Sequence, residues 1–345
     1  MSVNCGIIAL PEIFTPEHLP LNLCGRGKEM AELLRCLAPS AQGQRPLNIW
    51  LCGRTGTGKT ATLKAALARH AADHNVRCIY VNCFRTETAY AVLDHILTEL
   101  RVLRAETPQI AYKARRLMEA LGGRPLVVAL DEIDRMPMDE RESALHLLTE
   151  AGKVGLACVS ESRDSLFALN PKTVNRVAPV FLEFAPYEAD AVHEILADRA
   201  DVGLLVGSWS HALLERIARL SAGDARVAIQ TLRSAAHLAD SEALGFVEER
   251  HVEYGFQKAQ ELRREYRLRK LTVHHRVLYE IVKQKGRAAM GEVVRAYLER
   301  CKERNLPPVS KRCFNRYVEV LRRQRLLRGE KARVFGNVVH LEVVE

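Results

Sequence analysis

The fold is decided by one stretch, LNIWLCGRTGTGKT at residues 47–60. Its last eight residues fit the pattern G-x-x-x-x-G-K-[ST]; a short apolar run precedes them, and a helix-forming run, residues 61–72, follows. A buried strand, a glycine-rich loop and a helix together wrap phosphates in backbone N–H groups. The sequence therefore predicts a nucleotide-binding P-loop in preference to a glycine-rich structural turn.

Each residue of this loop has an expected role in holding the nucleotide. Lys59 should reach the β- and γ-phosphates, and the Thr60 hydroxyl should ligate Mg²⁺. The backbone of the rest of the loop should enclose the phosphates. The predicted nucleotide contacts in the loop are Gly53, Arg54, Thr55, Gly56, Thr57, Gly58, Lys59 and Thr60.

A second apolar strand, residues 126–130, ends in Asp131 and Glu132. Open parallel sheets bind ligands at the carboxyl ends of their strands, so this pair should lie near the P-loop. Asp131 is expected to hold the metal through water, and Glu132 to orient and polarise the attacking water. Asp134 either supports them or caps the next helix.

The remaining elements predict a parallel sheet covered on both faces. Further strands are expected at residues 77–83, 156–160 and 181–184, with helices at 28–35 and 90–103. From residue 187 to about 240 the pattern is purely helical, and a linker of mixed charge is expected at about 241–270.

Composition limits the class of protein. A chain of 345 residues accommodates two or three domains, and 48% hydrophobic residues is too apolar for a disordered chain. No apolar stretch reaches the roughly 20 residues of a membrane helix, so no membrane partner is expected. Nine cysteines without a C-x-x-C pair indicate reduced thiols in a cytoplasmic compartment, not a disulfide framework or a zinc site.

The basic excess lies entirely at the C-terminal end. Residues 261–345 carry 22 Lys+Arg and 10 Asp+Glu, a net +12, whereas the other 260 residues are at −3. Helices are expected at 271–284, 291–304 and 310–325, followed by a hairpin around Gly336-Asn337. Three helices and a hairpin describe a winged helix.

The helix at 310–325 separates into an apolar and a basic face. Phe314, Tyr317, Val318 and Leu321 recur at helical spacing, and Ser310 is a plausible N-cap. A rigid apolar back with donors near the N-terminal end suits the DNA major groove, although a winged helix can also dock proteins. The predicted DNA contacts are Lys311, Arg312, Asn315 and Arg316 on the helix and Lys331 and Arg333 on the wing.

The order of these parts resembles an AAA+ ATPase, and more closely an archaeal replication initiator of the origin-recognition and cell-division-cycle type. The resemblance covers nearly the whole chain. Its more specific pieces are Arg45-Pro46-Leu47-Asn48-Ile49, Tyr80-Val81-Asn82-Cys83, Ala185-Pro186-Tyr187, Gly223-Asp224-Ala225-Arg226 and Gly291-Glu292-Val293-Val294. It implies an AAA+ domain over 1–186, a helical lid over 187–260 and a winged helix over 261–345.

The resemblance also implies functional residues. Tyr187 would contact the nucleotide, and Arg226 would be the lid arginine that touches the γ-phosphate. Because Asp224 can cap a helix, Arg226 should lie in its first turn; a surface arginine is the alternative. Arg176 falls near the arginine finger, which acts on the ATP of a neighbouring copy or paralogue. A further DNA-contacting insertion would fall at 101–124, with Arg115 and Arg116.

One departure from the family concerns hydrolysis. The polar amide expected after the fourth strand is replaced by Glu161 in the run Cys158-Val159-Ser160-Glu161-Ser162. A carboxylate there adds negative charge near the γ-phosphate, which predicts ATP binding with slow hydrolysis.

The sequence thus predicts an ATP/ADP- and Mg²⁺-binding ATPase that binds duplex origin DNA on the nucleoid. The resemblance implies recruitment of the minichromosome-maintenance helicase. Two alternatives stay open. One is a DNA-binding regulator that keeps ATP or ADP as a structural cofactor; the other is a clamp-loader-like remodelling ATPase.

Overall fold

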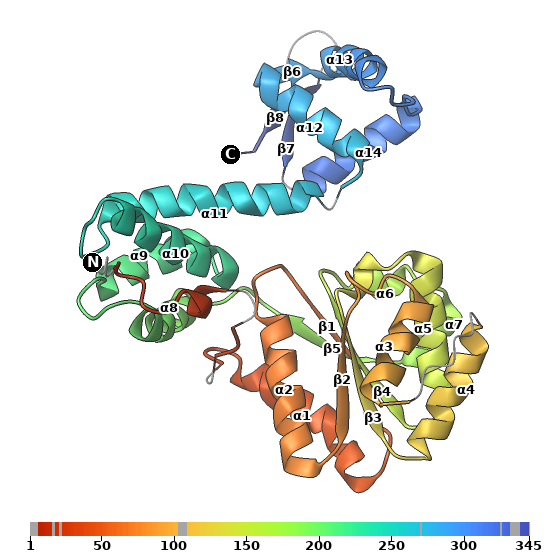
Figure 1. Cartoon of the computed structure of the whole chain (residues 1–345). Coiled ribbons are helices and arrows are strands. Elements are labelled where there is room, and N and C mark those ends of the chain that lie inside the picture. The colour runs from red at the N-terminus through yellow and green to blue at the C-terminus, as the bar shows by residue number, and fades with distance from the viewer. Residues whose placement is uncertain are drawn as a thin grey trace. The chain divides into compact units, whose positions relative to one another are not determined.

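The computed structural model describes residues 6–15, 18–20, 23–102, 109–269, 271–324, 326–331 and 339–344. The chain divides into two compact units, residues 1–256 and 257–345. Figure 1 shows the elements of both units along the chain. Among the described residues, no helix has the length and apolar character needed to cross a lipid bilayer.

The first unit contains a parallel sheet of five strands. They are β1 (Ile49–Gly53), β2 (Arg77–Asn82), β3 (Leu126–Asp131), β4 (Val154–Ser160) and β5 (Val180–Phe184). Their order is β2-β3-β4-β1-β5, and every pairing is parallel. This confirms the predicted α/β class. Because β1 lies between β4 and β5, the loop after it emerges within the sheet, at its carboxyl edge.

Helices cover both faces of this sheet, which is why its strands read as continuous apolar runs. One face carries α1 (Gly27–Leu37) and α2 (Lys59–His74), and the other carries the helices from α3 to α7 (Figure 1). These are α3 (Ala89–Glu99), α4 (Ile110–Leu121), α5 (Met138–Glu150), α6 (Asp164–Phe167) and α7 (Pro171–Val177). Short 3-10 turns stand at η2 (Ala38–Gln42) and η3 (Ile133–Arg135).

The predicted helix over 90–103 is shorter in the structure. It stops at Glu99, and Arg101 takes a left-handed backbone with φ 58°. The Val102 N–H donates to the Leu97 carbonyl at 3.0 Å, which satisfies one of the open carbonyls of the last turn. A separate helix, α4, then begins at Ile110.

The lid consists of α8 (Ala189–Gly203), α9 (His211–Ser221) and α10 (Ala225–Ser241), as the all-helical pattern predicts. The segment from residue 7 to residue 14 packs here and not on the sheet. Ile7 and the η1 residues (Pro11–Phe14) Ile13 and Phe14 belong to the lid core, and Arg199 donates to the Ile13 carbonyl. The domain boundary expected at 186 therefore omits a lid segment from the start of the chain. Its short apolar pieces carry no periodicity that would reveal their packing partner.

The expected linker at 241–270 is largely a helix, α11 (Glu249–Arg269). Its mixed charges pair at helical spacing, with Lys258 bonded to Glu261 and Arg269 near Glu265. Such pairs stabilise exposed helices, so the same charges that suggest a linker support a helix. The boundary between the two units falls inside this helix.

The second unit has a winged-helix arrangement. Its helices are α12 (Val273–Lys285), α13 (Met290–Glu303) and α14 (Lys311–Arg323), and its strands are β6 (Arg287–Ala289), β7 (Leu327–Lys331) and β8 (Val339–Val343). The strands form an antiparallel sheet in the order β6-β8-β7. The hairpin pattern predicts two strands, and the structure adds a third, β6, which has only three residues. The predicted turn at Gly336-Asn337 lies outside the described residues.

We predict that Phe14→Ala destabilises the lid. Phe14 is 2% exposed, and its ring lies where any side chain at Gly203 would be. Loss of such a ring costs about 3 kcal/mol of unfolding free energy. Denaturant unfolding followed by the fluorescence of Trp209, which is partly buried against the lid core, measures this. Phe84→Ala, at an exposed ring, is the matched control and should leave the transition unchanged. Equal transitions for both variants would contradict the placement of Phe14.

Candidate functional site

The P-loop joins β1 to α2 at the carboxyl edge of the sheet. Gly56 and Gly58 have φ values of 80° and 83°, in the left-handed region that favours glycine. A Cβ on Gly58 would lie 2.0 Å from the Tyr187 hydroxyl, and one on Gly56 would lie 1.8 Å from the Asp224 carboxylate. Two independent constraints, backbone conformation and lack of space, therefore require glycine at these positions.

Lys59 opens α2, and its side chain is almost buried. Its ammonium donates to the Gly53 and Arg54 carbonyls at 2.6 and 2.8 Å. Burial lowers the pKa of Lys59, while the carboxylates of Glu161, Asp131 and Asp134 oppose that shift. A desolvated cation on the loop, next to the open N–H groups of the first turn of α2, fits the phosphates of a nucleotide.

Asp131 ends β3 and is 2% exposed. Its Oδ2 accepts hydrogen bonds from the Thr60 hydroxyl at 2.9 Å and the Tyr80 hydroxyl at 2.6 Å, and its Oδ1 accepts from the Glu132 N–H at 2.9 Å. The structure thus brings together Thr60 and Asp131, the two predicted metal-site residues. Tyr80 belongs to the family-like run Tyr80-Val81-Asn82-Cys83, which by itself predicts no contact for its hydroxyl.

A magnesium ion fits these residues only together with other ligands. No group of three His, Cys, Asp or Glu in the described ranges could hold a metal ion alone. Mg²⁺ needs near-octahedral oxygen ligands and keeps several waters when a nucleotide supplies phosphate oxygens. Thr60 and Asp131 provide a hydroxyl and a carboxylate of the right chemistry for such a shared site.

Three charged side chains meet beside Asp131. The Arg135 guanidinium lies 3.7 Å from the Glu132 carboxylate and 3.8 Å from the Glu161 carboxylate. The Glu161 N–H donates to Asp134 at 3.2 Å. Asp134 therefore links two loops instead of capping α5, whose N-cap is Pro137. Among the carboxylates that raise the pKa of Lys59, Glu161 has the largest effect.

The lid meets the P-loop through the start of α10. The Asp224 carboxylate accepts from the Arg226 and Val227 N–H groups at 3.1 and 3.2 Å, which confirms the predicted N-cap and puts Arg226 in the first turn. The Ala225 N–H donates to the Gly56 carbonyl at 3.1 Å. The positive charge of Arg226 contributes to lowering the pKa of Lys59, so the two cations face the same region.

A residue that sequence reasoning missed, Arg26, connects three parts of the site. It is 4% exposed and donates to the Thr57 carbonyl at 3.0 Å and the Ala185 carbonyl at 2.5 Å. Its guanidinium also lies 4.0 Å from the centre of the Tyr187 ring. No motif marks Arg26, which precedes α1 and meets these partners only in the fold.

Arg176 lies on α7 and is partly exposed. Its guanidinium contacts the Glu150 carboxylate at 2.7 Å and His146 Nδ1 at 2.5 Å, both on α5. Within this chain it is thus bonded to α5. The predicted action on a neighbouring copy would require it to exchange these contacts.

The second unit presents the predicted basic helix. Phe314, Val318 and Leu321 of α14 are buried, and the Ser310 hydroxyl accepts from the Cys313 N–H at 3.4 Å. The opposite side exposes Lys311, Arg312, Asn315 and Arg316. Over the described ranges, the three cations of that set form no ion pair, whereas other arginines of this unit, such as Arg287 and Arg304, bond to glutamates.

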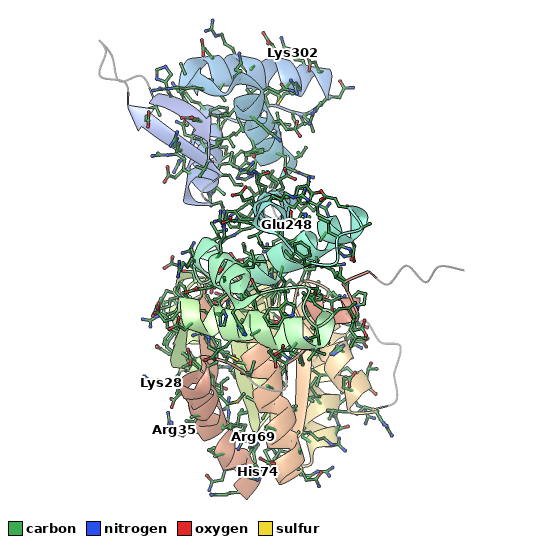
Figure 2. The ribbon with its side chains drawn as sticks, turned by 90° about the vertical axis from the view of Figure 1, so that its left-hand side faces the viewer. Lys28, Arg35, Arg69, His74, Glu248 and Lys302 are labelled. Carbon is green, nitrogen blue, oxygen red and sulfur yellow. The ribbon has the colours of Figure 1, made fainter. Side chains whose placement is uncertain are left out.

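The structure describes only some of the other side chains that are predicted to contact DNA. Arg333 and the Lys331 side chain lie outside the described residues. In the first unit, Arg115 and Arg116 both bond to Glu119 on α4. Figure 2 shows further cations of that unit, with Lys28 and Arg35 on α1 and Arg69 on α2, all at the surface.

Two family models match the chain. Residues 42–160 match an AAA domain, and residues 193–257 match a Cdc6 AAA+ ATPase-type lid domain. Curated relatives are the ORC1-type DNA replication proteins of Thermococcus kodakarensis, 30% identical over 87% of this chain and 77% of that protein, and of Pyrococcus abyssi, 29% identical over 87% and 78%.

Solved structures agree over nearly the full length. The Aeropyrum pernix ORC1 protein in complex with DNA has a TM-score of 0.79 and 25% identity, covering 98% of this chain and 94% of that one. Cdc6p from Pyrobaculum aerophilum, at 22% identity, has a TM-score of 0.68 with coverage of 98% and 94%, which supports the fold alone.

We predict that Arg26→Met weakens the first unit. The change removes hydrogen bonds to two carbonyls and leaves Glu29, its ion-pair partner at 2.6 Å, without that charge. Loss of such buried bonds costs about 2 kcal/mol of unfolding free energy. Thermal unfolding by circular dichroism measures it. Arg69→Met, at the exposed position in Figure 2, should leave the midpoint unchanged. An unchanged midpoint for Arg26→Met would refute the stabilising role of Arg26.

Proposed function

The chain belongs to the family of ORC1-type DNA replication proteins, and from this premise we propose that it is an ATP-controlled initiator that binds duplex origin DNA. The observation that carries the DNA-binding part is the set of three exposed cations on α14 that form no ion pair with any residue that the structure describes. A helix with a rigid apolar back and free donors near its N-terminal end can enter the major groove. The DNA complex of the Aeropyrum pernix relative supports the same proposal.

In the nucleotide-binding part, each side chain has a proposed role. Lys59 and the P-loop backbone hold the phosphates, with Tyr187 at the edge of the loop, and Thr60 and Asp131 hold Mg²⁺. When bound, Mg²⁺ would neutralise phosphate charge. Glu132 would orient and polarise the attacking water, and Arg226 would contact the γ-phosphate from the lid.

Coupling between nucleotide and lid follows from the contacts of α10. Asp224 and Ala225, at the start of α10, contact the P-loop. A bound triphosphate would move the loop by displacing Lys59 from its carbonyls, and it would attract Arg226 in the first turn of α10. Either effect would act on the position of the lid. We propose the functional parts 1–186, 187–260 and 261–345, with the lid segment around Ile7–Phe14 added to the second. Hydrolysis then acts as a switch between lid states.

Partners extend this proposal. Recruitment of the minichromosome-maintenance helicase is proposed from the family, and Arg176 would act on ATP bound by a further copy or paralogue after leaving Glu150. The site of action would be the nucleoid in the cytoplasm.

One observation favours a second function, a regulator that keeps its nucleotide. Glu161 shares Arg135 with Glu132 and adds a negative charge beside Lys59. Both features disfavour hydrolysis, while the hydrogen bonds of Lys59 to the loop carbonyls do not involve Glu161.

We predict ATP binding with a single-turnover hydrolysis rate below about 1 s⁻¹, the low end of typical turnover. Glu161→Gln removes the extra charge and should raise this rate about tenfold, because charge near the developing transition state dominates such reactions. Phosphate release after rapid mixing measures both rates.

The control variant Glu132→Gln should bind ATP and release no phosphate. A faster wild-type rate would refute slow hydrolysis, and no phosphate release from wild type or Glu161→Gln would favour the regulator.

We predict a salt dependence of duplex binding set by phosphate contacts. With about six contacts, the log–log slope of affinity against salt should be near −5. Arg316→Ala and Arg333→Ala should each flatten it by about one unit. Fluorescence anisotropy of labelled duplex at several salt concentrations tests this. Glu319→Gln, on the same helix, is a control that should not flatten the slope. An unchanged slope in both arginine variants would remove α14 and the wing from the interface.

A further inference from the structure

We propose that Tyr80 is a positioning residue whose hydroxyl orients the Asp131 carboxylate for the divalent cation of the nucleotide complex. This inference rests on the proposed nucleotide site and assigns a role to a residue outside the P-loop and the Asp-Glu pair.

The two side chains are brought together by neighbouring strands. Tyr80 of β2 pairs in register with Ala129 of β3, two residues before Asp131. Because alternate residues of a strand share a face, Tyr80 and Asp131 lie on the same side of the sheet, the side covered by α2. The Tyr80 hydroxyl reaches Asp131 Oδ2 at 2.6 Å, the shorter of the two side-chain bonds to that oxygen.

The phenol is itself held in place. Its ring is half-buried, and the Lys64 ammonium of α2 lies 4.5 Å from the ring centre. The backbone at this position is fixed separately, since the Tyr80 carbonyl lies 3.2 Å from His95 Nε2. A fixed donor of this kind costs little entropy when it orients its partner.

Different donors bond to the two carboxylate oxygens of Asp131. Tyr80 and Thr60 both bond to Oδ2, while the Glu132 N–H bonds to Oδ1. When the Thr60 hydroxyl oxygen serves a metal, the Tyr80 bond still holds Oδ2 and so keeps the carboxylate in one rotamer. Partners that orient a metal-binding carboxylate commonly change metal affinity by tenfold or more when removed.

Tyr80→Phe tests this, because it removes the hydroxyl and retains the ring. Release of a fluorescent ADP analogue is followed at increasing MgCl₂ and, separately, in EDTA. We expect the Mg²⁺ concentration that slows release to rise about tenfold, with release in EDTA unchanged. Cys78→Ala, two residues earlier on the same strand face, should match wild type in both conditions.

Asp131→Asn provides the second comparison. If Tyr80 acts through Asp131, Tyr80→Phe should add nothing in that background, whereas additive losses would overturn the proposal. Equal weakening with Mg²⁺ and with EDTA would indicate a merely structural tyrosine, and an unchanged Mg²⁺ response would also overturn it. A wild-type chain that bound no nucleotide in either condition would instead refute the proposed function.

Discussion

The close packing of the lid against the P-loop is the constraint on which the site depends. Asp224 caps α10 and at the same time fills the space beside Gly56, while Tyr187 fills the space beside Gly58. Side chains of the lid therefore lie directly against the loop at the two glycines. The lid thus contacts the loop both through these two side chains and through a backbone bond from the Ala225 N–H to the Gly56 carbonyl.

The hydrolytic end of the site combines charges that oppose one another. Asp131 is surrounded by donors, whereas Glu132 and Glu161 share the guanidinium of Arg135. A carboxylate at 161 partly neutralises Lys59 and competes for the cation next to the proposed base. The hydrogen bonds of the P-loop do not involve Arg135, whereas the charge of Glu161 acts both on Lys59 and on Arg135.

Local patterns predicted much of the site. Glycine spacing and a strand ending in Asp-Glu are short-range signals, and the cap at Asp224 follows from residues two and three positions away. The contacts of Arg26 and Tyr80 could not be predicted from local patterns. The partners of Arg26 are about 30 and 160 residues away in the sequence, and the partner of Tyr80 is about 50 residues away. The packing of residues 7–14 on the lid could not be predicted for the same reason. The helix α11 was not predicted because charges at helical spacing are also typical of a solvated linker.

The sequence by itself determined the parallel sheet, the phosphate loop, the helical lid and the basic face of α14, because hydrophobic periodicity, glycine spacing and charge are properties of neighbouring residues. Only the tertiary structure decided which buried cation clamps the loop, which hydroxyl holds Asp131 and where Glu161 directs its charge. Those contacts depend on strand order and register, which bring together side chains that no local pattern connects.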